Sequence, residues 1–383
     1  MPVYFAFALT LFNMTGVRAG RVLLALYALK LGAQPFAVGV LAATFSVFPM
    51  LLSWQIGRLS DRFGSRWLLA FGAAGGGCGM LVPYFVPGLP ALYVAAAMNG
   101  LSFAFYNVSI QNLVGLLSSP STRTKNFSNY TLVISVTSFL GPLLCGFAID
   151  HAGFALTCVY IAVLSLVPVA MLVIRGGVLP GGTRQEKSSG GLREALVVPG
   201  IWRVLAICSV VQAGIDLFNF YMPIYGHAVN LSASAIGVVL SMFSAAAFVV
   251  RLVMPRLLAW RSEETVLAYS LYIGAASFLL VPFFKTAAVL ALISFMFGLG
   301  MGCGQPITMM LTYSLSAAGR SGETLGLRLT INHLTRVIGP VLFGAIGSVF
   351  GLLAVFWVNG LVLASGGAAT RPGSASRAGT EEK

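Results

Sequence analysis

Charged residues are scarce in this sequence. Among its 383 residues only 9% are Asp, Glu, Lys or Arg, whereas 58% are hydrophobic. A soluble globular chain carries about 25% charged residues, so a large soluble fold is excluded, because too few polar side chains remain to cover its surface. Apolar runs of at least ~18 residues recur along the whole length, which is enough for a helix to cross a membrane. We therefore predict a polytopic membrane protein with no separate soluble domain.

Residues that hold metals or perform catalysis are also few. The three histidines and five cysteines form no metal-ligand spacing and no C-x-x-C pair. The chain contains no G-x-x-x-x-G-K-[ST] phosphate loop, no H-E-x-x-H, no G-x-S-x-G and no carboxylate pair within one apolar run. We therefore expect no metal, no cofactor and no enzymatic activity. Without an ATP-binding motif, energy must come from an ion gradient or from a substrate's own gradient.

Positive charge dominates, with 23 lysines and arginines against ten acidic residues and a net charge of +13. Most of these cations lie in the connections that alternate segments place on one side, whereas Lys30 and Lys285 fall on the other. This is the positive-inside bias, which makes the basic side cytoplasmic. The charge thus reflects topology, and we expect no nucleic-acid partner. No cleavable signal peptide is visible. We predict a multi-pass protein of the inner (plasma) membrane with both termini cytoplasmic.

The apolar runs divide into twelve predicted transmembrane spans, with boundaries good to a few residues. They cover residues 3–30, 36–57, 67–86, 90–115, 128–149, 153–174, 199–226, 233–254, 265–284, 286–314, 323–349 and 351–369. The fold class predicted from them is all-α. The final residues, 370–383, are polar and predict a disordered cytoplasmic tail.

A Gly- and Ser-rich stretch at 176–198 predicts a flexible cytoplasmic linker between residues 1–175 and 199–369. These halves are repeats, because adding 198 to a residue number in the first half often gives the same residue in the second. Examples are Gly16 with Gly214, Phe45-Ser46 with Phe243-Ser244, Gly100-Leu101 with Gly298-Leu299, and Gly141-Pro142 with Gly339-Pro340. A constant offset over the length of a half predicts two similar six-helix bundles.

A charged stretch lies between the second and third apolar runs, at residues 57–66. It contains Gly57, Asp61, Arg62, Gly64 and Arg66 in the pattern G-x-L-x-D-R-x-G-x-R. This pattern resembles the signature loop between the second and third helices of the major facilitator superfamily (MFS) of transporters. The alternative is an ordinary basic cytoplasmic loop.

The resemblance covers the full chain and implies twelve helices in two six-helix bundles related by an axis along the membrane normal, around a central cavity. In that family the loop acid is thought to lock the cytoplasmic gate. The resemblance thus implies a gating role for Asp61, and we expect Asp61→Asn to shift the resting conformation toward inward-open.

A second motif lies in the fifth span, where residues 141–146 read G-P-L-L-C-G. It is similar to the G-P-x-x-G-G of MFS antiporters, although Cys145 replaces a glycine. Proline removes a backbone hydrogen bond and glycines permit close helix packing, so we predict helix kinks at Gly141-Pro142 and at the repeated Gly339-Pro340. A packing kink without any meaning for antiport remains the alternative.

One family feature is absent. Drug–proton antiporters usually carry an arginine in the fourth span, where this chain has Ala96. The repeated loop in the second half is also degraded, because Ala259 stands where Asp61 would recur. Both departures weaken the expectation of proton antiport by the family's usual residues.

Charged residues inside predicted spans are costly, at about 2.5–3.5 kcal/mol each on insertion scales, and mark a cavity or an ion pair. Arg18 and Arg21 share one face of the first span, and the repeat places Asp216 and Asn219 at the equivalent positions of the seventh. One reading is an anion-attracting site beside a titratable Asp216, and the other is a structural Arg18–Asp216 pair. Arg336 either counters Asp216 or adds a third positive charge.

Other polar residues lie in spans four, ten and eleven. Asn107 and Gln305 occupy equivalent positions, and Gln111 follows Asn107 by one helical turn. They are candidate cavity hydrogen-bonders, or else polar groups packed between helices. Asp216 and His333 are candidate proton carriers, although an intramembrane histidine is more often a packing group.

These patterns predict a secondary active transporter of a small organic solute that works by alternating access, with proton-coupled efflux favoured by the fifth-span motif. The alternative is an uptake symporter or exchanger for an organic anion, favoured by Arg18, Arg21 and Arg336. The expected partners are a small and possibly anionic substrate, a coupling proton and the lipid bilayer. We expect a monomer.

Overall fold

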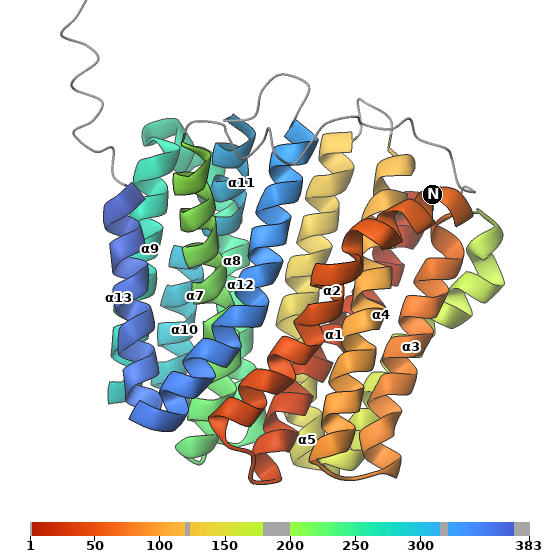
Figure 1. Cartoon of the computed structure of the whole chain (residues 1–383), viewed down its shortest axis with the longest axis horizontal. Coiled ribbons are helices and arrows are strands. Elements are labelled where there is room, and N and C mark those ends of the chain that lie inside the picture. Colours follow the sequence, from red (N-terminus) through yellow and green to blue (C-terminus); the bar gives the residue numbers. More distant parts are fainter. Residues whose placement is uncertain (1, 119–122, 179–199, 315–320, 371–383) are drawn as a thin grey trace, which may run out of the picture. The chain divides into compact units, whose positions relative to one another are not determined.

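The computed structural model describes residues 2–118, 123–178, 200–314 and 321–370, and in these ranges the regular backbone is helical throughout, with no strand. Figure 1 shows the arrangement of the helices. The first part contains α1 (Pro2–Lys30), α2 (Pro35–Phe63), α3 (Ser65–Phe85), α4 (Leu89–Leu116), α5 (Arg123–Arg175) and the short η1 (Gly176–Val178). The second part contains α7 (Ile201–Ala228), α8 (Ala233–Trp260), α9 (Glu263–Leu280), η2 (Val281–Phe283), α10 (Ala287–Met301), α11 (Gly304–Ser314), α12 (Ser321–Phe350) and α13 (Leu352–Thr370).

The predicted all-α architecture of twelve spans is confirmed. Ten described segments are long and apolar enough to cross a membrane, and one of them, Asn129–Arg175, is 47 residues long. That segment holds two spans, because the backbone of α5 leaves helical geometry at Gly153, with φ 77° and ψ 173°. The remaining span is α1, whose 29 residues include Arg18 and Arg21. The tenth span consists of α10 and α11, which a short interruption separates.

The charged stretch at residues 57–66 was predicted to be a loop, but most of it is helical. Helix α2 continues through it to Phe63, and only Gly64, with φ 80°, turns the chain into α3. The Gly64 amide donates to the carbonyl oxygen of Ser60 at 3.0 Å, and the hydroxyls of Ser60 and Ser65 lie 3.2 Å apart. Charged residues do not end a helix, whereas a glycine with positive φ does. The side chains of Asp61 and Arg62, and residue Gly57 in this motif, lie outside the described part, so the gating role stays a prediction.

The described chain separates into two compact units. The first contains residues up to the end of η1 together with Phe220–Ser241, and the second contains the described residues up to Asn219 together with those from Met242 onward. In the first unit α1 packs along α5 and α3 along α4, and in the second α13 and α10 each pack along α9. Most of the predicted linker, and the tail after Thr370, lie outside the described residues, so the predicted division into bundles and linker remains a prediction.

The sequence repeat is visible in the packing of each unit. A side-chain carbon placed on Gly100 of α4 would lie 2.3 Å from the carbonyl oxygen of Phe45 in α2. In the second unit, a carbon on Gly298 of α10 would lie 2.3 Å from the carbonyl oxygen of Phe243 in α8. Both residues of the second pair are offset from those of the first by 198 positions. The two halves therefore reuse the same helix contact.

Candidate functional site

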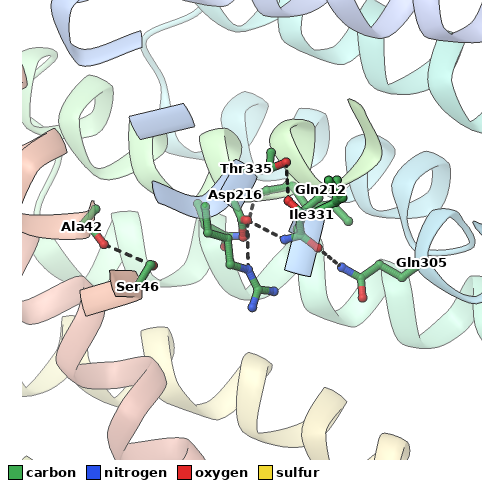
Figure 2. A network of polar contacts seen from close by, with 10 residues as sticks. Ala42, Ser46, Gln212, Asp216, Gln305, Ile331 and Thr335 are labelled. Carbon is green, nitrogen blue, oxygen red and sulfur yellow. Dashed lines mark hydrogen bonds and ion pairs between the residues drawn. The ribbon is translucent and has the colours of Figure 1, made fainter. Parts of the chain in front are cut away.

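A polar network in the second unit connects three helices. Asp216 of α7 accepts two hydrogen bonds on Oδ2, one from Gln212 Nε2 at 2.5 Å and one from Arg336 Nε of α12 at 3.1 Å. Gln305 of α11 donates its Nε2 to Gln212 Oε1 at 2.6 Å. Figure 2 shows Gln305 reaching Gln212, and Gln212 reaching the carboxylate of Asp216. An intramembrane acid is thus held by one guanidinium and a relay of two amides.

The side chains of this network differ in their exposed fraction. Gln212 is 1% exposed, whereas the side chains of Asp216 and Arg336 are 20% and 24% exposed. The ion pair is therefore partly exposed but still shielded enough for its attraction to matter.

Local sequence explains why Gln212 faces Asp216. Residues four positions apart lie on the same face of a helix, one turn from each other. Gln212 is otherwise an uncharged residue in an apolar run, and sequence reasoning missed it for that reason. The available signal was its spacing of four residues before the single acid of α7.

A second arginine, Arg328, was also missed as a site residue. It is 6% exposed, and its Nη2 donates to the carbonyl oxygen of Gln305 and to Thr308 Oγ1, each at 3.2 Å. Arg328 lies inside the predicted span 323–349, and this position was the sequence signal that could have identified it. Arg328 therefore connects α12 to the backbone that presents Gln305.

Arg21 of α1 lies in the first unit, among aromatic rings. Its Cζ is 4.0 Å from the ring centroid of Phe45 and 5.4 Å from that of Phe103. A guanidinium within ~6 Å of a ring face gains about 0.5–2 kcal/mol from the ring quadrupole, more when desolvated. The cation is therefore stabilised by packing inside the span, at a position between α2 and α4.

Arg18 lies where α1 crosses α5. A side-chain carbon on Gly141 would lie 2.5 Å from Cβ of Arg18 and 3.0 Å from the Ala19 nitrogen. The predicted close approach at this glycine is therefore present. Pro142 lies inside α5 and Pro340 inside α12, and both helices continue past their prolines.

The other half of the fifth-span motif contacts α8 within the first unit. A side-chain carbon on Gly146 would lie 2.3 Å from the carbonyl oxygen of Ala233, and one on Gly237 would lie 2.5 Å from that of Pro142. Ser241 Oγ donates to the carbonyl oxygen of Phe139 at 2.8 Å. The motif thus forms a close antiparallel seam between α5 and α8.

The seam ends at a carboxylate. Asp150 accepts from the backbone N–H groups of Ala233 at 3.0 Å and Ser234 at 2.7 Å, which are the first amides of α8. Helix-terminal amides lack partners in their own helix and favour an anion. Asp150 of α5 therefore caps α8.

The remaining predicted residues are distributed over α3, α4, α7 and α12. Asn219 is exposed, and its Nδ2 donates to the carbonyl oxygen of Ile215 in its own helix at 2.8 Å. Asn107 is half-buried and Gln111 exposed on α4, and His333 is half-buried on α12. Arg66 Nη2 donates to the carbonyl oxygen of Leu172 at 3.2 Å, which joins the start of α3 to α5.

The chain is similar to a known family and to known proteins. A family model described as Major Facilitator Superfamily matches residues 6–340. The uncharacterized MFS-type transporter YuxJ of Bacillus subtilis (strain 168) is 25% identical over 342 residues, which cover 85% of each chain. The quinolone resistance protein NorA of Staphylococcus aureus (strain COL) is 22% identical over 352 residues, covering 89% of this chain and 88% of NorA.

Solved structures share the fold. The nucleoside transporter NupG superposes with a TM-score of 0.78 at 13% identity, covering 96% of this chain and 97% of that one. The peptide transporter POT in complex with sulfate superposes with a TM-score of 0.79 at 16% identity, covering 96% and 93%. At these identities the likeness concerns the fold alone.

Proposed function

We propose, on the premise that this chain belongs to the Major Facilitator Superfamily, that it is a secondary active transporter that expels a small organic solute in exchange for protons. The family is one of transporters, and the chain is a multi-pass membrane protein. The efflux direction and the proton coupling are our proposal. Similarity to NorA, whose name refers to quinolone resistance, supports efflux of organic compounds.

The observation that carries the proposal is the partly exposed pair between Asp216 and Arg336, 3.1 Å apart inside spanning helices. Protonation of Asp216 removes its negative charge and with it the attraction that holds Arg336. The two protonation states then favour different local arrangements of α7 and α12. A group whose contacts differ between two conformations biases their equilibrium by the difference in interaction energy.

The side-chain amides of Gln212 and Gln305 carry the effect of Asp216 protonation further. When Asp216 loses its charge, the hydrogen bond from Gln212 Nε2 weakens, because charge-assisted hydrogen bonds are about twice as strong as neutral ones. Gln212 is then free to change its partner, and Gln305, bonded to it at 2.6 Å, changes with it. We propose that Asp216 binds the coupling proton, and that Gln212 and Gln305 transmit its state to α11.

A second candidate is an uptake symporter or exchanger for an organic anion. The arginines inside spans favour it, because Arg18, Arg21 and Arg336 bring positive charge into an apolar region where an anion would be a natural partner. We further propose an inner-membrane location, cytoplasmic termini and a monomer. Asn107, Gln111 and Asn219 are additional candidate cavity groups, and His333 is a second candidate proton carrier.

Transport into proteoliposomes tests the proposal. Purified protein is reconstituted with an imposed pH gradient and given a fluorescent quinolone or radiolabelled benzoate. We expect quinolone to accumulate against its gradient in exchange for protons, to stop when nigericin collapses the pH gradient, and to fall at least about tenfold in Asp216→Asn. Glu264→Gln, which removes an acid from the first turn of α9, serves as the matched control.

The results for quinolone and benzoate distinguish the two candidate functions. Gradient-driven quinolone transport in Asp216→Asn equal to that of wild type would remove Asp216 as the coupling group. Uptake of benzoate without any movement of quinolone would favour the anion transporter instead.

A further inference from the structure

The tenth span is interrupted at a carbonyl group that cannot be satisfied within the helix. Helix α10 ends at Met301 and α11 begins at Gly304. In an α-helix the carbonyl of Gly302 would accept from the N–H of residue 306, but Pro306 has none. Beside this position, Gly302 N donates to Gly298 O at 2.9 Å and Ile307 N to Cys303 O at 3.0 Å. The bond from residue 306 to the Gly302 carbonyl is the one that the proline itself removes.

A side chain from another helix occupies that position. Arg251 of α8 donates its Nε to the carbonyl oxygen of Gly302 at 3.2 Å. Helix α8 also packs closely on the interruption, since a side-chain carbon on Gly302 would lie 2.6 Å from Val250 Cγ1 and 2.7 Å from Ala247 Cα. An unsatisfied carbonyl within a membrane costs several kcal/mol. Arg251 supplies the donor that the proline removed.

The first half of the chain is an internal control. At the equivalent positions, 198 residues earlier, Val108 replaces Pro306 and Ser53 replaces Arg251. There the corresponding helix, α4, runs unbroken from Leu89 to Leu116. The proline, the arginine and the interruption thus occur together in one repeat and are all missing from the other.

The interruption also bears directly on the polar network. Gln305 immediately precedes Pro306, and its side chain donates to Gln212, the partner of Asp216. On the opposite side, Arg328 Nη2 donates to the Gln305 carbonyl at 3.2 Å. Two arginines from two different helices therefore hold the backbone at Gly302 and at Gln305, the residue whose side chain donates to Gln212.

We propose that Arg251 is a positioning residue, which replaces the backbone donor that Pro306 lacks and so holds Gln305 in the network around Asp216. In this role Arg251 acts through the backbone of span ten, at the Gly302 carbonyl. The consequence for transport rests on the function proposed above, whereas the consequence for stability does not. The two are therefore tested separately.

The stability test is a double-mutant cycle with Arg251→Leu, Pro306→Ala and the combined variant, in purified protein. Arg251→Leu leaves the Gly302 carbonyl without its donor and should lower Tm by about 5 °C. In the Pro306→Ala background, the N–H of the introduced alanine restores the helical bond, so the same arginine substitution should cost at most a third of that. Arg256→Leu, on the same helix but exposed, should change Tm little in either background.

Expression failure does not obscure this result. If Arg251→Leu alone does not fold but the combined variant does, the rescue is the predicted coupling. Equal losses of Tm from Arg251→Leu with and without Pro306 would overturn the proposal, because Arg251 would then contribute something other than the missing donor.

The transport test uses Gln305. If Arg251 acts through Gln305, Arg251→Leu should lower quinolone transport about tenfold in wild type but cause no additional loss in Gln305→Ala, since coupled sites are not additive. Arg251→Lys, which retains a donor of different geometry, should recover part of the rate. Additive losses would overturn the positioning role even where the stability cycle shows coupling. A lack of transport in all variants, including wild type, would refute the proposed function and leave the stability cycle to decide on Arg251.

Discussion

Gly298 of α10 lies directly against the backbone of Phe243 in α8, so that any side chain on the glycine would meet the carbonyl oxygen at 2.3 Å. The same carbon would lie 2.8 Å from Cβ of Ala246. Backbone atoms cannot move aside as the end of a flexible side chain can, so the two helices would have to separate. In membranes, where lipid is as apolar as the side chains, such close packing is a main source of helix association.

Gly298→Ala should therefore destabilise the second unit, although alanine favours a helix by about 1 kcal/mol relative to glycine. We expect a net loss of about 1–3 kcal/mol, the usual cost of overpacking, measured as a lower Tm in detergent. Gly339→Ala is the matched control, because no described atom other than those of its chain neighbours and its own helix backbone lies within 4 Å of the position that its new carbon would take. A Tm of Gly298→Ala at or above that of Gly339→Ala would contradict the packing argument.

The pair of Asp216 and Arg336 predicts a strongly non-additive result. Removing one partner leaves an uncompensated charge inside the membrane, which typically costs about 3–5 kcal/mol, whereas replacing both partners is often nearly neutral. Asp216→Asn and Arg336→Gln should each lower Tm, and the combined variant should recover most of the loss. Simple addition of the two losses would show that the ion pair contributes little. The double variant should still fail to couple transport to protons, because the titratable group is gone.

Sequence patterns were sufficient for the spans and the repeat, because both depend on runs and spacings that survive any arrangement of helices. They also identified Asp216, Arg336 and Gln305, since polar groups in apolar runs are conspicuous. Two readings for the partner of Asp216 were open, and the structure pairs it with Arg336. That choice depends on how helices rotate and pack, which hydrophobic periodicity constrains weakly in a membrane, where most faces are apolar.

Other features could be recognised only from the course of the backbone and not from the sequence. The charged stretch at 57–66 read as a loop because charges interrupt an apolar run, but the helix ends only at Gly64. Arg251 and Arg328 donate to the carbonyl groups of Gly302 and Gln305, and such contacts depend on how the helices pack. The sequence shows that Pro306 lacks an N–H, but it does not show that Arg251 supplies the replacing donor.

Asp150 should contribute to stability as a cap supplied from another helix. Its carboxylate accepts from the amides of Ala233 and Ser234, at 3.0 and 2.7 Å. Loss of a cap typically costs about 1 kcal/mol, so Asp150→Ala should lower Tm by a few degrees. Asp150→Asn, which keeps an acceptor but loses the charge, should fall between. The neighbouring His151 is exposed and lies 2.8 Å from the Phe147 carbonyl of its own helix, so His151→Ala should be nearly neutral. Equal losses for Asp150→Ala and His151→Ala would rule out the cap.

Arg21 and Phe45 provide the last test, which bears on the anion alternative. Because the guanidinium lies 4.0 Å from the ring centroid, Arg21→Leu and Phe45→Leu should each lower Tm, with a coupling of about 0.5–2 kcal/mol between them. The same variants are then titrated with benzoate, a neutral sugar and a cationic dye in a thermal-shift assay. If Arg21 serves packing alone, benzoate should shift Tm equally little in wild type and Arg21→Leu. If benzoate instead raises Tm of wild type and Arg21→Leu abolishes the shift, the guanidinium binds anions despite its stacking, and the organic-anion transporter becomes the better account of the intramembrane arginines.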